Sequence, residues 1–139
     1  MFKIEYKKNP TTIEVNSIMS LHNVGKHEEA FYKCKNFIIK YPNSPLLYNI
    51  FGVINAGKSD FTNAIYSYLY AIKIKPNYAQ AFNNLAVLLK KLGEINLAII
   101  SYIKAINLKP DYIEAFNNIG LIYFEINEYQ KSKNFFKQA

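Results

Sequence analysis

The chain has 139 residues, half of them hydrophobic, and a formal net charge of +7. This composition argues against a disordered chain, because a chain of this length and hydrophobicity can bury a substantial core. The charge comes entirely from lysine, and the absence of arginine counts against a dedicated phosphate or nucleic-acid site, where the planar guanidinium is usually required.

The lone cysteine and the pattern of hydrophobic residues bear on the compartment. Cys34 has no partner in the chain for a disulfide or a thiolate metal cage, which is compatible with a reducing environment. Residues 1–10 are interrupted by charges and do not resemble a signal peptide, and no apolar run approaches the ~20 residues of a membrane span. We therefore expect a cytoplasmic protein with no membrane span, in which residues 1–10 form a leader or flexible arm.

Helical spacing of apolar residues begins at residue 11. Thr12 is the expected N-cap of a first helix that places Ile13, Ile18 and Leu21 on one side. The helix should end at residues 23–25, since Asn and Gly readily adopt the left-handed conformation that closes a helix.

Three further helices are expected before residue 78. One should run over 28–40 and stop before Pro42, and the unit that follows, 45–78, should break at 57–59. Asp60 is a good N-cap for the second helix of that unit. The unit 79–112 should turn at Gly93.

A constant period relates these units. Pro42, Pro76 and Pro110 are equally spaced along the chain, and the segment 79–84 (Ala-Gln-Ala-Phe-Asn-Asn) recurs at the same interval as Ile-Glu-Ala-Phe-Asn-Asn at 113–118. A fixed period of this size, about 34 residues, is typical of stacked supersecondary units. The sequence therefore predicts an all-α protein built from repeated helical hairpins.

The residues at repeated positions resemble the tetratricopeptide repeat. Its pattern of aromatic, apolar and small residues, then alanine, aromatic and proline, is carried by Phe116/Ile119/Gly120/Tyr123, Ala64/Tyr68/Ala71/Pro76 and Ala98/Tyr102/Ala105/Pro110. The resemblance implies a right-handed α-solenoid of stacked antiparallel hairpins, with one domain over 11–139. Its repeats would be 11–44 (degenerate), 45–78, 79–112 and 113–139 (truncated, turning at 126–128).

Residues suited to catalysis are few and poorly placed. His22 and His27 are five residues apart across a turn, which is poor spacing for one metal on one helix face, and both are expected at the surface. Cys34 falls at a core position, where a buried small hydrophobe is the simpler interpretation. We therefore predict no enzyme activity, no metal and no cofactor.

Binding has better support through the resemblance, which implies that the first helix of each repeat lines a groove for an extended peptide. The family's groove positions correspond here to Asn16, Asn49, Gln80, Asn83, Asn84, Val87, Lys90, Lys91, Glu114, Asn117 and Asn118, with Met19, Val53 and Leu121 between them. An amide side chain both donates and accepts, so it can pair with a peptide backbone of any sequence.

The asparagines leave two interpretations open. Asn16, Asn84 and Asn118 share one repeat position, which resembles the asparagine ladder of the repeat domain of O-linked N-acetylglucosamine transferases. Alternatively, asparagine is simply abundant and solvated. The carboxylate clamp of chaperone-binding repeats is disfavoured, because it needs lysine or arginine where this chain has Gln80 and Glu114.

The expected partner is thus a protein or peptide. An alternative from another class is a non-catalytic docking module of a larger glycosyl- or sulfotransferase-type enzyme. Nucleic-acid binding is disfavoured by the even spread of lysines. Apolar groups on the last repeat also predict self-association, through Tyr123, Ile126, Phe135 and Phe136.

Overall fold

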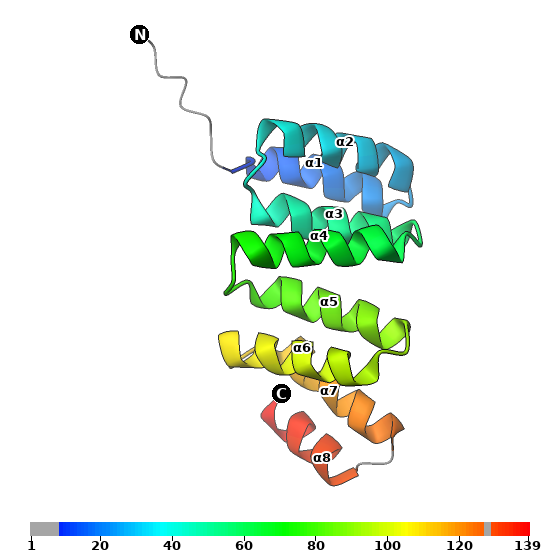
Figure 1. Ribbon diagram of the computed structural model, residues 1–139, viewed down its shortest axis with the longest axis vertical. Coiled ribbons are helices and arrows are strands. Elements are labelled where there is room, and N and C mark those ends of the chain that lie inside the picture. The colour runs from blue at the N-terminus through cyan, green and yellow to red at the C-terminus, as the bar shows by residue number, and fades with distance from the viewer. Residues whose placement is uncertain (1–8, 127–128) are drawn as a thin grey trace. The chain divides into compact units, whose positions relative to one another are not determined.

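The computed structural model describes residues 9–126 and 129–139, except for the side chains of residues 129–132, and these residues are all-helical. Eight helices follow one another in this part of the chain as paired hairpins (Figure 1). They are α1 (Thr12–Asn23), α2 (His27–Lys40), α3 (Pro45–Gly57), α4 (Phe61–Ile74), α5 (Ala79–Lys91), α6 (Ile95–Leu108), α7 (Ile113–Glu125) and α8 (Tyr129–Gln138). The predicted all-α class and the hairpin arrangement are confirmed.

Helix α1 begins one residue earlier than its predicted cap implied. Thr11, not Thr12, is the N-cap: its hydroxyl accepts from the Glu14 N–H at 3.2 Å, and its own N–H donates to Glu14 Oε2 at 2.8 Å. This reciprocal pair forms a capping box, which satisfies two N–H groups that the helix leaves unpaired. Ile13 is 82% exposed, so its predicted place on the buried side of the helix is wrong.

Glu14 also ties the start of α1 to the end of α2. Lys40 Nζ donates to Glu14 Oε1 at 2.8 Å, and the Tyr41 hydroxyl donates to Glu14 Oε2 at 2.9 Å. The hydrogen bond from Lys40, followed by that from the Thr11 N–H, lowers the pKa of Glu14 from 4.5 to about 2. The most degenerate repeat is therefore closed by a polar cluster where the family has an aromatic residue.

The turns recur at one repeat position. Gly25 and Gly93 adopt φ values of +80° and +82°, the left-handed region that glycine enters without strain. Ser59 occupies the equivalent position and takes φ of +62°. Asp60 then caps α4 by accepting from the Asn63 N–H at 3.3 Å, as predicted.

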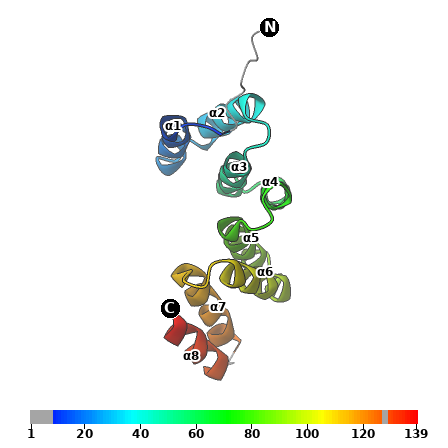
Figure 2. The ribbon, with the colours of Figure 1, turned by 90° about the vertical axis from the view of Figure 1, so that its left-hand side faces the viewer.

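The chain divides into two compact units, Met1–Pro76 and Asn77–Ala139. The sequence predicted one domain over 11–139; the division falls at the end of the second predicted repeat. Within each unit the paired helices lie beside each other, as Figure 2 shows in a view that looks nearly along the helix axes. Most of the predicted arm, residues 1–8, lies outside the described residues, as do 127 and 128 of the last predicted turn.

In unit 1, helices α1 to α3 enclose a mainly aliphatic core. α1 packs on α2 and α3, and α3 packs on α2 and α4. The core consists of the buried residues Ile18, Ala30, Cys34, Tyr41, Leu47, Ile50 and Ile54. Each fully buried aliphatic side chain contributes about 1.5–3 kcal/mol relative to exposure, so these contacts supply much of what holds the hairpins together.

In unit 2, small residues allow close approach of the helices and aromatic rings fill the remaining space. α5 packs on α6, α6 on α7 and α7 on α8. The core consists of Ala86, Ala98, Tyr102, Ala105, Ala115, Ile119 and Ile122. Tyr123 and Phe135 add a stacked pair with ring centroids 5.4 Å apart.

Candidate functional site

The predicted peptide-binding residues of unit 2 lie on α5 and α7, the first helices of its two repeats. Four are exposed and four are partly buried, so eight present atoms to solvent. The exposed ones are Gln80, Val87, Lys91 and Glu114, and the partly buried ones are Asn84, Lys90, Asn117 and Asn118.

Asn83 and Asn49, which share one repeat position, are placed differently from the expectation. Asn83 is fully buried and Asn49 is 3% exposed. Asn83 Nδ2 donates to Glu114 Oε1 at 3.1 Å, so this side chain joins α5 to α7. As placed here, neither amide is open to a ligand. Asn117, at the same position in α7, is only partly buried.

A second polar contact joins the same two helices at their other ends. Lys90 Nζ donates to Glu125 Oε1 at 3.0 Å, with both side chains partly exposed. Surface ion pairs of this kind contribute little stability, typically about 0–1 kcal/mol, but they fix side-chain positions. The Asn83–Glu114 and Lys90–Glu125 contacts therefore bracket the α5/α7 surface, which we define as Asn84, Val87, Asn118 and Leu121.

The α5/α7 surface combines two amides with two apolar side chains. Val87 is 45% and Leu121 44% exposed, while Asn84 and Asn118 are partly buried beside them. Val87 and Leu121 occupy the same repeat position, as do Asn84 and Asn118. An extended segment crossing both helices would meet the same amide and apolar pair twice, at one-repeat spacing.

In unit 1, one predicted site residue is exposed, Asn16 on α1. Asn16 and the buried Asn49 are the two predicted site residues that fall in this unit. Unit 1 therefore offers one accessible amide from the predicted set, in contrast to the α5/α7 surface.

A histidine pair beside the α1–α2 turn was missed by sequence reasoning. His22 and His27, predicted as surface residues, are both partly buried, with their Nδ1 atoms 3.1 Å apart and ring centroids at 4.8 Å. A hydrogen bond at this distance needs an N–H on one Nδ1 and a lone pair on the other. Burial, followed by the charge of His27, lowers the pKa of His22. The signal available in sequence was the turn that brings the two residues together.

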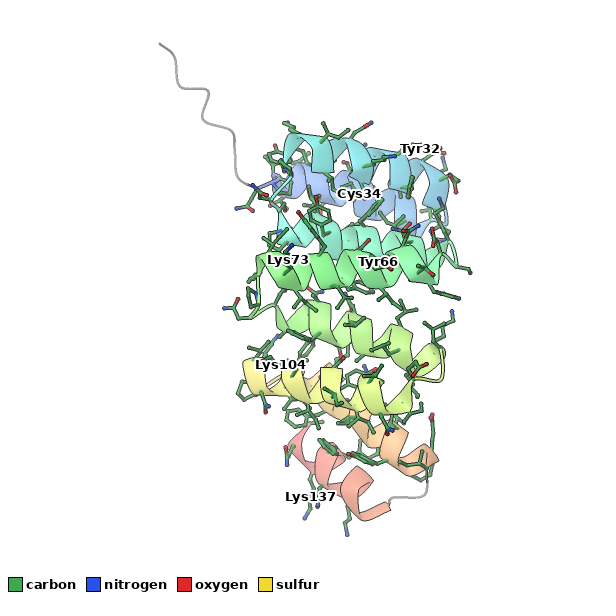
Figure 3. All side chains as sticks on the ribbon, in the orientation of Figure 1. Tyr32, Cys34, Tyr66, Lys73, Lys104 and Lys137 are labelled. Carbon is green, nitrogen blue, oxygen red and sulfur yellow. The ribbon has the colours of Figure 1, made fainter. Side chains whose placement is uncertain are left out.

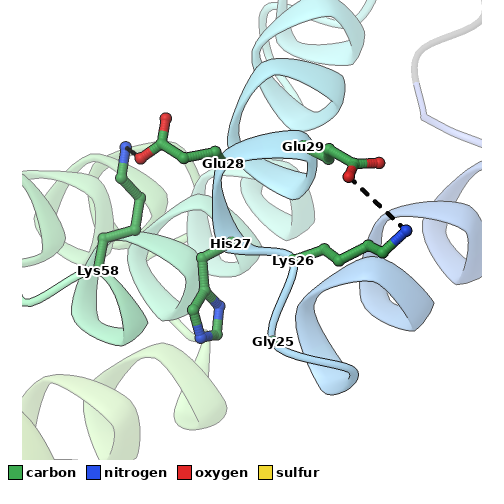
Figure 4. Close-up of a pocket in the computed structure, with 6 residues that line it drawn as sticks. All are labelled: Gly25, Lys26, His27, Glu28, Glu29 and Lys58. Carbon is green, nitrogen blue, oxygen red and sulfur yellow. Dashed lines mark ion pairs between the residues drawn. The ribbon is translucent and has the colours of Figure 1, made fainter.

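A surface pocket of about 400 Å³ opens next to this pair (Figure 4). Its lining charges are matched: Lys58 Nζ lies 2.8 Å from Glu28 Oε1, and Lys26 Nζ lies 3.7 Å from Glu29 Oε1. Because each lysine is paired with a carboxylate, the pocket presents no net charge that would select an ion.

Other reactive groups are closed off. Cys34 is fully buried, and burial raises the pKa of its thiol to about 12, which confirms its predicted place in the core. Within residues 9–126 and 129–139, no three His, Cys, Asp or Glu side chains come together as a metal site would require. Over the same residues, no helix has the length and apolarity needed to cross a membrane.

Comparison with known families decides the relationship. The sequence profile of the TPR repeat matches residues 58–93 and 88–127, together half of the chain. The chain belongs to the tetratricopeptide repeat family. Repeats of this family mediate protein–protein interactions.

Individual TPR proteins are also similar to this chain. Photosystem I assembly protein Ycf3 of Dioscorea elephantipes is 37% identical over 84 residues, covering 58% of this chain and 48% of that protein. The chain thus spans about half the length of this curated relative. A crystal structure of MamA is 27% identical, with a TM-score of 0.79, over 90% of this chain and 73% of that one. Pseudomonas aeruginosa PilF (18% identity, TM-score 0.83, covering 91% and 58%) shares the fold.

Proposed function

We propose that this TPR protein is a protein-interaction scaffold that holds an extended segment of a partner on the α5/α7 surface. The observation that carries the proposal is the repeated pairing of an amide with an exposed apolar side chain, Asn84 with Val87 and Asn118 with Leu121, between two polar contacts. The amides would pair with the partner's backbone, and the apolar side chains would contact its side chains.

The proposal takes support from the arrangement of the contacts around this surface. Asn83–Glu114 and Lys90–Glu125 connect α5 to α7 at both ends of this surface, and α6 packs on both helices. A surface held by such contacts loses less conformational freedom on binding than one that must be ordered, which favours affinity. Ycf3, the curated relative, is named as an assembly protein, and family likeness supports a partner that is itself a protein.

The test is a peptide selection on the full chain followed by affinity measurement. Peptides would be selected from a displayed random library, and their dissociation constants measured by fluorescence anisotropy for the native chain and for Asn84→Ala/Asn118→Ala. Two lost hydrogen bonds at about 0.5–1.5 kcal/mol each predict binding weaker by roughly fivefold to more than a hundredfold.

The matched control is Asn107→Ala/Asn134→Ala, which removes two exposed amides from the second helices α6 and α8. This variant should bind the selected peptides like the native chain. Equal affinity for the α5/α7 variant and the native chain would show that the peptides bind elsewhere, and the proposal would fail.

A further inference from the structure

The segment that holds helices α4, α5 and α6 is poor in carboxylates. Between Asp60 and Asp111 the chain has one acidic residue, Glu94, against six lysines. Neither α4 nor α6 contains any Asp or Glu, so their outer sides carry only positive or neutral groups. Figure 3 labels Lys73 on α4 and Lys104 on α6 among these outer residues.

In unit 2, the outer side of α6 is apolar as well as basic. Leu97, Ile100 and Ile103 are 51%, 62% and 40% exposed, and Lys104 is exposed next to them. Spacings of three and four residues place all four on one side of the helix. This row, the α6 face, lies opposite the buried residues Ala98, Tyr102 and Ala105.

In unit 1, α4 repeats the arrangement with different side chains. Tyr66, Leu69 and Tyr70 are 66%, 46% and 42% exposed, and Lys73 Nζ lies 5.9 Å from the centre of the Tyr70 ring. Tyr66 and Leu69 occupy the same repeat positions as Ile100 and Ile103 of the following repeat. We call Tyr66, Leu69, Tyr70 and Lys73 the α4 face.

The two faces share their chemistry and not their shape. Both combine protruding apolar side chains with lysine and lack carboxylates, yet one presents aliphatic groups and the other phenol rings. A protein partner requires holes complementary to each side chain, which these two faces would not share. A lipid interface accepts protruding aliphatic and tyrosine side chains of any shape, while lysine extends its ammonium to the headgroups.

Charge selects the kind of lipid and argues against a second copy of the chain. Two α6 faces brought together would join two positively charged surfaces, neither of which contains a carboxylate. An anionic surface attracts the same lysines instead, by about fivefold in binding per lysine near the surface. We propose that the α6 face, and independently the α4 face, docks on the surface of an anionic lipid bilayer.

The test uses the full chain and vesicles of phosphatidylcholine, with or without one third phosphatidylserine. The chain should co-sediment with the phosphatidylserine vesicles and not with phosphatidylcholine alone, and added salt should release it. Lys104→Gln together with Lys73→Gln, which removes the lysine of each face, should weaken binding about fivefold. Absence of co-sedimentation, or equal binding to both kinds of vesicle, would overturn the proposal.

Variants of unchanged charge test the apolar contribution. Leu97→Ser/Ile100→Ser on α6 combined with Tyr66→Ser/Leu69→Ser on α4 should reduce the bound fraction severalfold, whereas either pair alone should reduce it less, with circular dichroism confirming the fold. Val87→Ser/Leu121→Ser removes a matched exposed pair from the α5/α7 surface and should leave vesicle binding unchanged. If this control reduces binding as much as the α6 and α4 variants do, the docking faces are misassigned.

A fluorescent probe distinguishes a bilayer from an acidic protein. The chain contains no tryptophan, so Ile100→Trp introduces a single, selectively excitable tryptophan at the most exposed apolar position of the α6 face. Its emission should shift to the blue on phosphatidylserine vesicles, because the indole enters the apolar interface. An unshifted emission would overturn docking through the α6 face. Tight binding to poly-glutamate without binding to vesicles would identify an acidic polypeptide as the partner and overturn the proposal as a whole.

Discussion

Buried asparagines differ in this molecule according to whether they find a partner. Asn83 donates through Nδ2 to Glu114 and leaves its Oδ1 without a hydrogen-bond partner, whereas in the fully buried Asn55 neither Nδ2 nor Oδ1 has a partner among the described residues. A buried polar group without a partner costs about 1–3 kcal/mol. Asn55 occupies the repeat position that holds Leu89 in α5 and Tyr123 in α7, so an apolar residue suits this place.

Replacing Asn55 with leucine should therefore stabilise the protein. Leucine has a similar volume and removes both unpaired atoms, which predicts an increase of about 1–3 kcal/mol in the free energy of unfolding. Chemical denaturation monitored by circular dichroism measures it. Asn83→Leu is the matched control and should not stabilise, because it breaks the bond to Glu114; a loss of stability in Asn55→Leu would contradict the assignment.

Glu14 makes stability depend on acid pH. Its pKa is lowered from 4.5 to about 2 in the folded chain. As the pH falls, Glu14 is therefore protonated in the unfolded chain at a higher pH than in the folded chain. The stabilisation is complete above pH 4.5 and is lost as the pH falls toward 2. Glu14→Gln should show a shallower decline of the melting temperature over this interval than the native chain. Parallel declines would mean that Glu14 is not held as described.

At the scale of elements, two glycines at one repeat position respond differently to a methyl group. A Cβ on Gly52 would lie 2.4 Å from Cε1 of the buried Tyr68, while one on Gly120 would lie 3.0 Å from Cε1 of Phe136, which is 41% exposed. The Tyr68 ring is enclosed and cannot retreat, but Phe136 near the end of α8 can.

Gly52→Ala should consequently lower the free energy of unfolding by about 1–3 kcal/mol, the usual effect of overpacking. Gly120→Ala should be near neutral, because the better helix propensity of alanine, worth about 1 kcal/mol, offsets the smaller clash. Thermal or urea unfolding of both variants measures the difference. Equal destabilisation would show that the ring of Phe136 is as confined as that of Tyr68.

The elements were the most predictable part of the molecule. Apolar spacing, Asp60 and Gly93 are local features, and they located the helices and turns closely. The site was less predictable because exposure depends on neighbours that sequence does not reveal. Asn83 and Asn84 are adjacent and chemically identical, yet one is buried against Glu114 and the other is not. The contact between His22 and His27 likewise depends on how the turn folds back.

At the scale of the whole molecule, the constant repeat period predicted the family, and the structure adds the division into two compact units at Pro76. A period describes each hairpin and its neighbour, so it does not indicate where along the array the chain divides into compact units. Which partner binds is equally outside the period, because recognition rests on the few residues that vary between repeats.

The predicted self-association can now be assigned to particular side chains. Phe135 stacks on Tyr123 inside unit 2, whereas Ile126 is 47% and Phe136 41% exposed. We expect the chain to form concentration-dependent oligomers in light scattering, and Ile126→Ser to shift them toward monomer by removing exposed apolar area. A monodisperse monomer at all concentrations would contradict this prediction, leaving the α5/α7 surface unaffected.

The buried position of Cys34 makes its thiol a reporter of local unfolding. The chain has one thiol, which is fully buried, with Sγ 3.6 Å from the Leu47 carbonyl oxygen and its pKa raised to about 12. A maleimide can label it only when the α2–α3 contact opens, so the ratio of the labelling rates of the folded and unfolded chains reports the free energy of that opening. We expect labelling in the folded chain to be orders of magnitude slower than in urea, and to slow further whenever a bound partner stabilises unit 1.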